Sequence, residues 1–282
     1  MHVSFGDDPL VVPPTLESLP GRELLVPPTD VPTRRGCWWC STCPARTVSA
    51  CSRAKAQAAT VLVVVDHHAT NTRFGTHHLV DAEAPATVVL VEELLRRLGA
   101  KMTPEIATAL YTGLITDTRS FRHRTTASTH VMAERLLAAG ARHDVICRQI
   151  GDTVKFGYLK VLARALAAAS LEPAAAGGLG AVWTVVPRAL RAEHSLTLHE
   201  IDDVIDVLRT TAEAEVAFVL KEEDNGGRHV SVRSKGRVDV GRVCAALGGG
   251  GHRPMAGFRT SEDASTTVSR LLGLLANVRV GA

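Results

Sequence analysis

The sequence predicts an α/β fold in two parts, and three features lead to this prediction. An uninterrupted apolar run at residues 61–65 is typical of a strand buried on both faces, as in parallel sheets. Between residues 85 and 169 the pattern is largely helical, with recognisable starts and ends. From residue 181 strand patterns dominate and include a hairpin around residues 225–227. We therefore expect a parallel-sheet domain followed by a smaller mixed α/β domain.

Composition narrows the class of protein. With 45% hydrophobic and 22% charged residues, the 282-residue chain has the composition of a soluble globular protein large enough for two domains. The formal net charge of +3 is too small to attract acidic ligands over the whole surface, so such a ligand would need a local binding site. The apolar runs are short and interrupted by charges, so we expect no membrane partner and a cytoplasmic location.

The N-terminal part is irregular. The first 36 residues are rich in proline, which favours short strands or extended connections over helices. Cys37, Cys40 and Cys43 then repeat at metal-ligand spacing, and Cys51 follows. A zinc knuckle is one interpretation, but two adjacent tryptophans and the absence of a later CxxC pair argue against it.

The genetic code offers another interpretation of this segment. Trp has one codon and Cys has two, so the nucleotides under residues 36–43 are largely fixed. When these nucleotides are translated in the frame that starts at the third base of each codon, they encode an apolar strand that ends in Asp, Asn, His or Tyr. We hypothesise that residues 34–53 are a frameshifted passage. We then expect poor packing there, with Trp38 and Trp39 exposed or in irregular backbone.

Chemistry is concentrated after the apolar run. Asp66, His67 and His68 follow it directly, and ligands of open α/β sheets collect beyond the carboxyl ends of the strands. A carboxylate and two imidazoles can bind a divalent metal. The alternative is that Asp66 caps a turn and both histidines are solvated. Three such residues after a buried strand favour the metal site.

A second candidate carboxylate, Asp117, follows two further predicted elements. We expect a short strand at residues 77–81 and an amphipathic helix within residues 84–99, with Gly99 directly after its last turn. Thr103 is the expected N-cap of another helix, which carries Asp117 to its far end. A turn-forming role is the alternative for Asp117.

The second half contains a glycine run. Gly248 to Gly251 precede His252, and consecutive glycines imply close backbone approach, typically to phosphate oxygens bound by amide N–H groups. A flexible hinge is the alternative. Arg233 on a nearby predicted strand favours an anion site.

Three segments together carry a resemblance. VVVDHHATN, YTGLITDTRSFR and GGGGHRPMAGF, in this order, resemble the DHH phosphoesterase superfamily with its DHH-associated C-terminal domain. The branch that they resemble contains the bifunctional oligoribonucleases and 3′-phosphoadenosine 5′-phosphate phosphatases. The resemblance implies a parallel-sheet DHH domain, a smaller mixed α/β domain, and an active-site cleft between them that holds two Mn²⁺ ions.

The resemblance also implies roles for individual residues. His67 and Asp117 resemble metal ligands, while Asp66 and His68 resemble catalytic residues that orient the ligands or contact phosphate. The substrate-binding residues that it implies are Arg233, Ser234, Gly249, Gly250, Gly251 and His252.

The chain departs from the family pattern in three places. The family's first motif, a His followed by two nearby Asp, is not found before His67. The Asp of its second motif would fall in the Cys/Trp segment, where the chain has Ser41 and Thr42. Arg119 stands where the family has Gly. We therefore expect an N-terminally truncated DHH domain with an incomplete metal shell.

The expected domains are an incomplete or irregular part at 1–57, the DHH domain at 58–165, a linker at 166–180 and the DHH-associated substrate-binding domain at 181–282. The expected function is metal-dependent hydrolysis of short oligoribonucleotides, 3′-phosphoadenosine 5′-phosphate or related dinucleotides. The alternative is a catalytically impaired remnant that only binds nucleotides. The expected partners are short RNA or DNA oligonucleotides or nucleotide phosphates, and a homodimer is left open.

Overall fold

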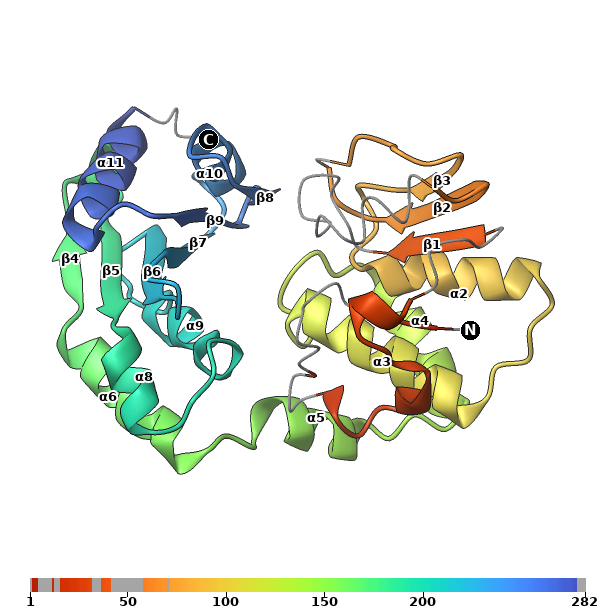
Figure 1. Ribbon diagram of the computed structural model, residues 1–282. Helices are drawn as coiled ribbons and strands as arrows, with labels where there is room; N and C mark the ends of the chain where they lie inside the picture. Colours follow the sequence, from red (N-terminus) through yellow and green to blue (C-terminus); the bar gives the residue numbers. More distant parts are fainter. Residues whose placement is uncertain are drawn as a thin grey trace. The chain divides into compact units, whose positions relative to one another are not determined.

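The computed structural model describes residues 2–4, 12, 16–31, 37–41, 58–69 and 71–277. The chain divides into two compact units, Met1–Thr153 and Val154–Ala282, and each is described by itself. Both units combine helices with a sheet, which confirms the predicted α/β class (Figure 1). Among the described residues, no helix is long and apolar enough to cross a membrane.

The sheet of the first unit is parallel. Its order is β1 (Cys37–Ser41), β2 (Val61–Asp66), β3 (His77–Val80). In the central strand β2, Leu62, Val64 and Val65 are buried, as the apolar run predicts. Two 3-10 turns, at Arg22–Leu24 and Pro28–Asp30, belong to the proline-rich part.

The described part of the Cys/Trp segment corrects one expectation. Residues 37–41 are not a misfit, because they form regular strand β1 in parallel register with β2, from Cys37↔Val61 to Ser41↔Val65. Backbone pairing depends little on side chains, so an unusual sequence can still form it. Trp38 packs against the β2 cluster, whereas Trp39 is 55% exposed. Residues 34–36 and 42–53 lie outside the described part of the chain.

The strand geometry also bears on the zinc interpretation. Cys37 and Cys40 are three residues apart in β1, and alternate strand residues point to opposite faces. Cys37 and Cys40 therefore cannot converge on one ion from a regular strand. The other two cysteines of the pattern lie outside the described residues.

Helices complete the first unit: α2 (Thr87–Arg97), α3 (Pro104–Thr118), α4 (Ala127–Ala138) and α5 (His143–Gly151). The predicted N-cap is confirmed, since the Thr103 side chain accepts a hydrogen bond from the Ile106 amide. α3 buries Leu114 and Ile115 in a cluster shared with α4. Its last turn carries Asp117, so packing of α3 positions this carboxylate.

The second unit has a six-stranded mixed sheet. Its order is β4 (Ser170–Glu172), β5 (Ala181–Val186), β6 (Val216–Glu222), β7 (Arg228–Ser234), β9 (Met255–Thr260), β8 (Gly250–His252). The predicted hairpin is confirmed: β6 and β7 are antiparallel and meet at Glu222↔Arg228.

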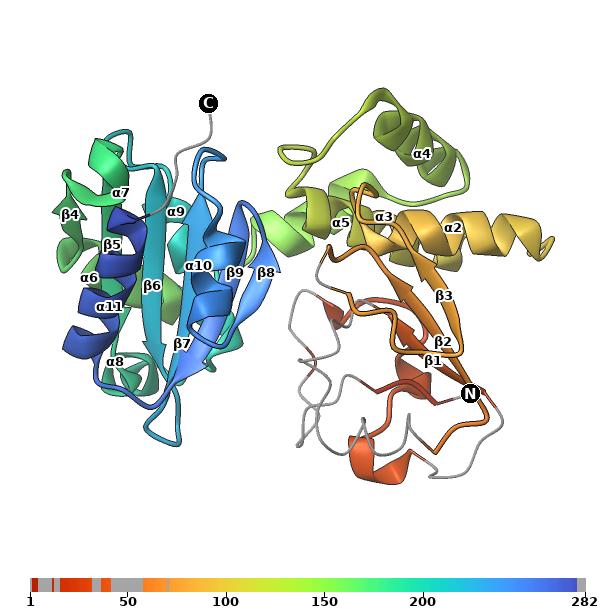
Figure 2. The same cartoon turned by 90° about the horizontal axis from the view of Figure 1, so that it is seen from above.

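Helices lie on both faces of this sheet (Figure 2). One face packs against α7 (Ala175–Gly178), α10 (Val240–Ala246) and α11 (Ala264–Ala276). The other packs against α6 (Phe156–Ala167), α8 (Arg188–Glu193), the 3-10 turn His199–Ile201 and α9 (Val204–Leu208).

The segment expected to be a linker is folded into the second unit. Residues 170–172 form β4, which pairs antiparallel with β5, and α7 buries Ala176 in the core beside α11. Small alanine side chains allow this close packing, although an alanine- and glycine-rich stretch is also typical of linkers.

We predict that Arg119→Gly stabilises the chain. Arg119 ends α3 with φ 48° and ψ 59°, a left-handed conformation that costs an L residue roughly 1–2 kcal/mol and costs glycine little. The free energy of unfolding, measured with urea, should rise by about 1 kcal/mol. Arg119→Ala keeps the Cβ atom and should show no such gain. Equal effects of glycine and alanine would contradict the prediction.

Candidate functional site

The carboxylate of Asp66 organises the end of β2. It is fully buried, and its Oδ1 accepts from the amides of His67 (2.8 Å) and His68 (3.2 Å) and from His68 Nδ1 (2.7 Å). Its Oδ2 accepts from Asn71 Nδ2 at 2.6 Å. Burial raises the pKa of Asp66, but the hydrogen bonds from His68 and Asn71 outweigh burial and lower it. Asp66 therefore positions the two histidines from within the protein.

The His67 ring is oriented by a backbone carbonyl. Its Nδ1 lies 3.2 Å from the Ala84 carbonyl oxygen, which can only accept, so Nδ1 carries the proton. Its Nε2 then offers a lone pair and lies 3.7 Å from Asp117 Oδ2. A metal-ligating histidine typically has this arrangement, with the second nitrogen donating to a carbonyl.

Burial shifts the pKa of both members of this pair. It lowers the pKa of His67, although the Asp117 charge opposes the shift, so the ring is neutral at pH 7. Burial likewise raises the pKa of Asp117, against the charges of His67 and His68 and a hydrogen bond from the Thr87 amide. A neutral imidazole beside a partly desolvated carboxylate suits a divalent cation, which would relieve the cost of burying the charge.

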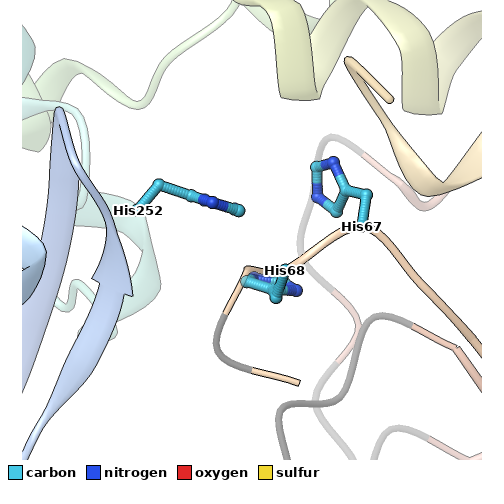
Figure 3. A group of neighbouring side chains, drawn as sticks. All are labelled: His67, His68 and His252. Atoms are coloured by element: carbon cyan, nitrogen blue, oxygen red, sulfur yellow. The ribbon is translucent and has the colours of Figure 1, made fainter. Parts of the chain in front are cut away.

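His68 adds a third donor atom. Its Nδ1 donates to Asp66, so Nε2 is unprotonated in the neutral ring. The rings of His67 and His68 meet edge to face with centroids 5.0 Å apart (Figure 3). His67, His68 and Asp117 offer nitrogen and oxygen donors, which are ligand types that divalent metals accept.

One short turn supports the whole group. The segment between β3 and α2 begins where the Asp81 amide donates to the Asp66 carbonyl. It continues with Ala84, which accepts from His67, and Thr87, whose amide donates to Asp117. Sequence reasoning missed these backbone contacts because main-chain groups leave no residue-type signal, and it also missed the side chain of Asn71, which donates to Asp66.

In the second unit, strand register places two expected substrate-binding residues on one face. Arg233 on β7 pairs with Met255 on β9, which pairs with His252 on β8. Directly paired residues project to the same face, and neighbouring strands are about 4.8 Å apart. Arg233 and His252 therefore share a face, two strands apart.

The glycines differ in what requires them. A Cβ at Gly249 would lie 2.1 Å from the Gly257 carbonyl oxygen, and one at Gly251 would lie 2.5 Å from that of Met255. These two glycines are needed for β8 to pack on β9. A Cβ at Gly250 would meet nothing within 4 Å. The fold of this unit does not explain Gly250.

Ser234 has a different place from that expected. It is buried, its hydroxyl donates to Glu215 Oε1 at 2.9 Å, and it accepts from the Gly236 amide at 2.8 Å. As the neighbour of Arg233 in a strand, it faces the opposite side of the sheet. Ser234 therefore holds the loop after β7, and its hydroxyl is occupied by the protein.

We predict that Asp66→Asn destabilises the chain by about 2–3 kcal/mol, because an amide places a donor among buried N–H groups. The folded pKa of Asp66 is depressed, so its contribution is present above the ordinary value of 3.8 and is lost as pH falls through the lower folded value. The difference in urea unfolding should thus persist at pH 7 and shrink below pH 3.8. Asp81→Asn is the control, because the Asp81 carboxylate is exposed and accepts a hydrogen bond from the Glu83 amide.

Comparisons with known proteins show which families the chain resembles. Residues 181–275 match the DHHA1 domain. The bifunctional oligoribonuclease and PAP phosphatase NrnA of Thermus thermophilus is 34% identical over 200 residues, 70% of this chain and 57% of that protein. The cyclic-di-AMP phosphodiesterase GdpP of Geobacillus thermodenitrificans is 30% identical over 217 residues, 71% of this chain and 30% of that protein. The chain thus spans less than two thirds of either relative.

Solved structures show the same fold. An exopolyphosphatase-related protein from Bacteroides fragilis aligns with a TM-score of 0.84 at 18% identity, over 97% of this chain and 82% of that one. RecJ of Thermus thermophilus in complex with Mn²⁺ aligns with a TM-score of 0.51 at 16% identity, over 88% and 46%. The chain therefore carries a DHHA1 domain at residues 181–275, is homologous to the oligoribonuclease and PAP phosphatase NrnA, and shares the fold of the DHH superfamily.

Proposed function

We propose that the chain is a metal-dependent phosphoesterase of the cytoplasm that hydrolyses short oligonucleotides, 3′-phosphoadenosine 5′-phosphate or related dinucleotides. The observation that carries the proposal is the His67–Asp117 pair, with Nε2 and Oδ2 3.7 Å apart and the far side of the imidazole held by Ala84. The homologues named for oligoribonuclease, PAP phosphatase and cyclic-di-AMP phosphodiesterase activities support this substrate class.

We propose different roles for the site residues of the first unit. His67 and Asp117 would hold the cation, for which we propose Mn²⁺, with His68 Nε2 as a third ligand or as a contact to the phosphate. A bound divalent ion supplies a water of lowered pKa and a positive charge next to the phosphate. Asp66 holds the His68 imidazole in its tautomer and orientation and fixes the backbone of His67, so its role is positioning.

We propose that the second unit binds the substrate's phosphate-bearing end. Arg233 and His252 share a sheet face, and a guanidinium with an imidazole suits a phosphate group. At Gly250 a ligand can approach the backbone closely, because the space where its Cβ would lie is open. Gly249 and Gly251 shape the strand that carries Gly250.

A second candidate function, a nucleotide-binding protein with impaired hydrolysis, is favoured by the end of β1. Ser41 pairs with Val65, directly before Asp66, so the described end of this strand offers a hydroxyl where the family carries a metal-bridging Asp. In the described part of the chain, Asp117 is the carboxylate that pairs with His67, while Asp66 is occupied by hydrogen bonds. Hard divalent ions prefer several oxygen ligands.

We predict that His67→Ala and Asp117→Ala each reduce Mn²⁺-dependent turnover of 3′-phosphoadenosine 5′-phosphate by at least about 100-fold and lower bound manganese, because each removes a ligand. Turnover and metal content are measured on the same purified samples. Asp81→Asn should behave as wild type. Turnover that survives both alanine variants would contradict the proposed site. Nucleotide binding without any turnover by the wild type would support the second candidate.

We predict that Gly250→Ala leaves stability within about 0.5 kcal/mol of wild type but weakens nucleotide binding about tenfold or more, since only a ligand meets its Cβ. Gly251→Ala should instead lower the melting temperature, because φ is 143° and the Cβ clashes with Met255 and Ala256. Thermal unfolding and titration of a nucleotide monophosphate check both. If Gly250→Ala binds the nucleotide as tightly as wild type does, Gly250 is not part of the binding site.

A further inference from the structure

The loop that follows Asp117 has an unusual backbone. Arg119, Ser120, Phe121 and Arg124 all have positive φ, between 48° and 64°. The loop is nevertheless well fixed: the amides of Arg122 and His123 both donate to the Thr118 carbonyl at 2.9 Å, and Phe121 stacks on His130. Left-handed conformations in non-glycine residues cost energy and persist where the surrounding structure enforces them, often at functional sites.

The Arg124 side chain is anchored to the turn that holds His67. Its Nη2 donates to the Ala82 carbonyl oxygen, and His67 Nδ1 donates to that of Ala84. The turn is closed by a hydrogen bond from the Ala84 amide to Asp81. Two residues of chain span at most about 7 Å, so the guanidinium is fixed in the neighbourhood of the His67 ring.

In the described part of the chain, the Arg124 side chain has one hydrogen bond, to the Ala82 carbonyl oxygen. Among the described residues, no carboxylate forms an ion pair with Arg124, and the residue is exposed. A guanidinium has five N–H donors, and the Ala82 carbonyl accepts from one of its nitrogens.

An anionic substrate creates a need for such a group. A phosphate at His67 and Asp117 meets the negative charges of Asp66 and Asp117, and a cation must offset the repulsion. A guanidinium matches two phosphate oxygens with two parallel hydrogen bonds. Its charge is permanent, and its anchor at Ala82 fixes it before substrate arrives.

We propose that Arg124 binds the non-bridging oxygens of the phosphate on which the His67–Asp117 site acts. This inference rests on the proposed function and deepens it. Arg124 is a second source of positive charge in the first unit, independent of any bound cation. The substrate class that it selects is a phosphate ester with two accessible anionic oxygens next to the scissile bond.

The test compares Arg124→Gln, Arg124→Lys and the control Arg148→Gln, which removes the same charge from α5 outside this loop. We expect Arg124→Gln to lower kcat/KM for 3′-phosphoadenosine 5′-phosphate about 100-fold, as for loss of an oxyanion donor. Arg124→Lys restores the charge but not the paired donors, so it should recover part of the loss. Arg148→Gln should match wild type. Bound manganese per chain should be equal in all four proteins.

A second readout does not depend on turnover. Inorganic phosphate is titrated into metal-free protein by calorimetry, and Arg124→Gln should weaken its binding at least about fivefold relative to Arg148→Gln. Equal phosphate affinity in these two variants overturns the inference, and so does a loss of manganese that parallels the loss of kcat/KM. If the wild type shows no turnover, the proposed function fails, and the phosphate titration still decides the role of Arg124. If Arg124→Gln does not fold, Arg124→Lys is judged by the same criteria.

Discussion

The candidate site depends on one buried carboxylate. Asp66 accepts four hydrogen bonds, and three of them come from the two residues that follow it. Burial opposes its charge, so these bonds must be complete for the carboxylate to remain inside the protein. The same requirement fixes the direction of the His68 imidazole and the backbone of His67. Within the Asp66-His67-His68 triplet, Asp66 therefore has a structural role, because its carboxylate positions the two histidines that follow it.

Much of the fold could be predicted because hydrophobic periodicity and capping signals are local. The buried strand at 61–66, the Thr103 cap and the hairpin at 225–227 all follow from neighbouring residue types. The segment at 166–180 was harder to predict. Alanine and glycine are typical of both linkers and closely packed elements, and only the neighbouring strand β5 decides between them.

Part of the candidate site could also be predicted, because some of its signals are local in the sequence. Chemistry at a strand end is visible in the sequence, so His67 and Asp117 could be named, and the structure places them together. For Asp66 the resemblance left two roles open, orienting the ligands or contacting phosphate, and its hydrogen-bond partners favour the first. The role of Ser234 could not be assigned, because it depends on Glu215, which is distant in the chain. The sequence also could not separate Gly250 from Gly249 and Gly251. The structure does so, because a Cβ atom would meet nothing within 4 Å at Gly250 and would clash at the other two.

The turn between β3 and α2 has a consequence for how the site can change. Its successive backbone groups meet Arg124, His67 and Asp117, through Ala82, Ala84 and Thr87. A single-residue insertion or deletion there would displace three side chains from three other segments at once. Such a connection cannot vary in length as surface loops usually do, and it transmits any backbone shift to the ligands and the arginine in concert.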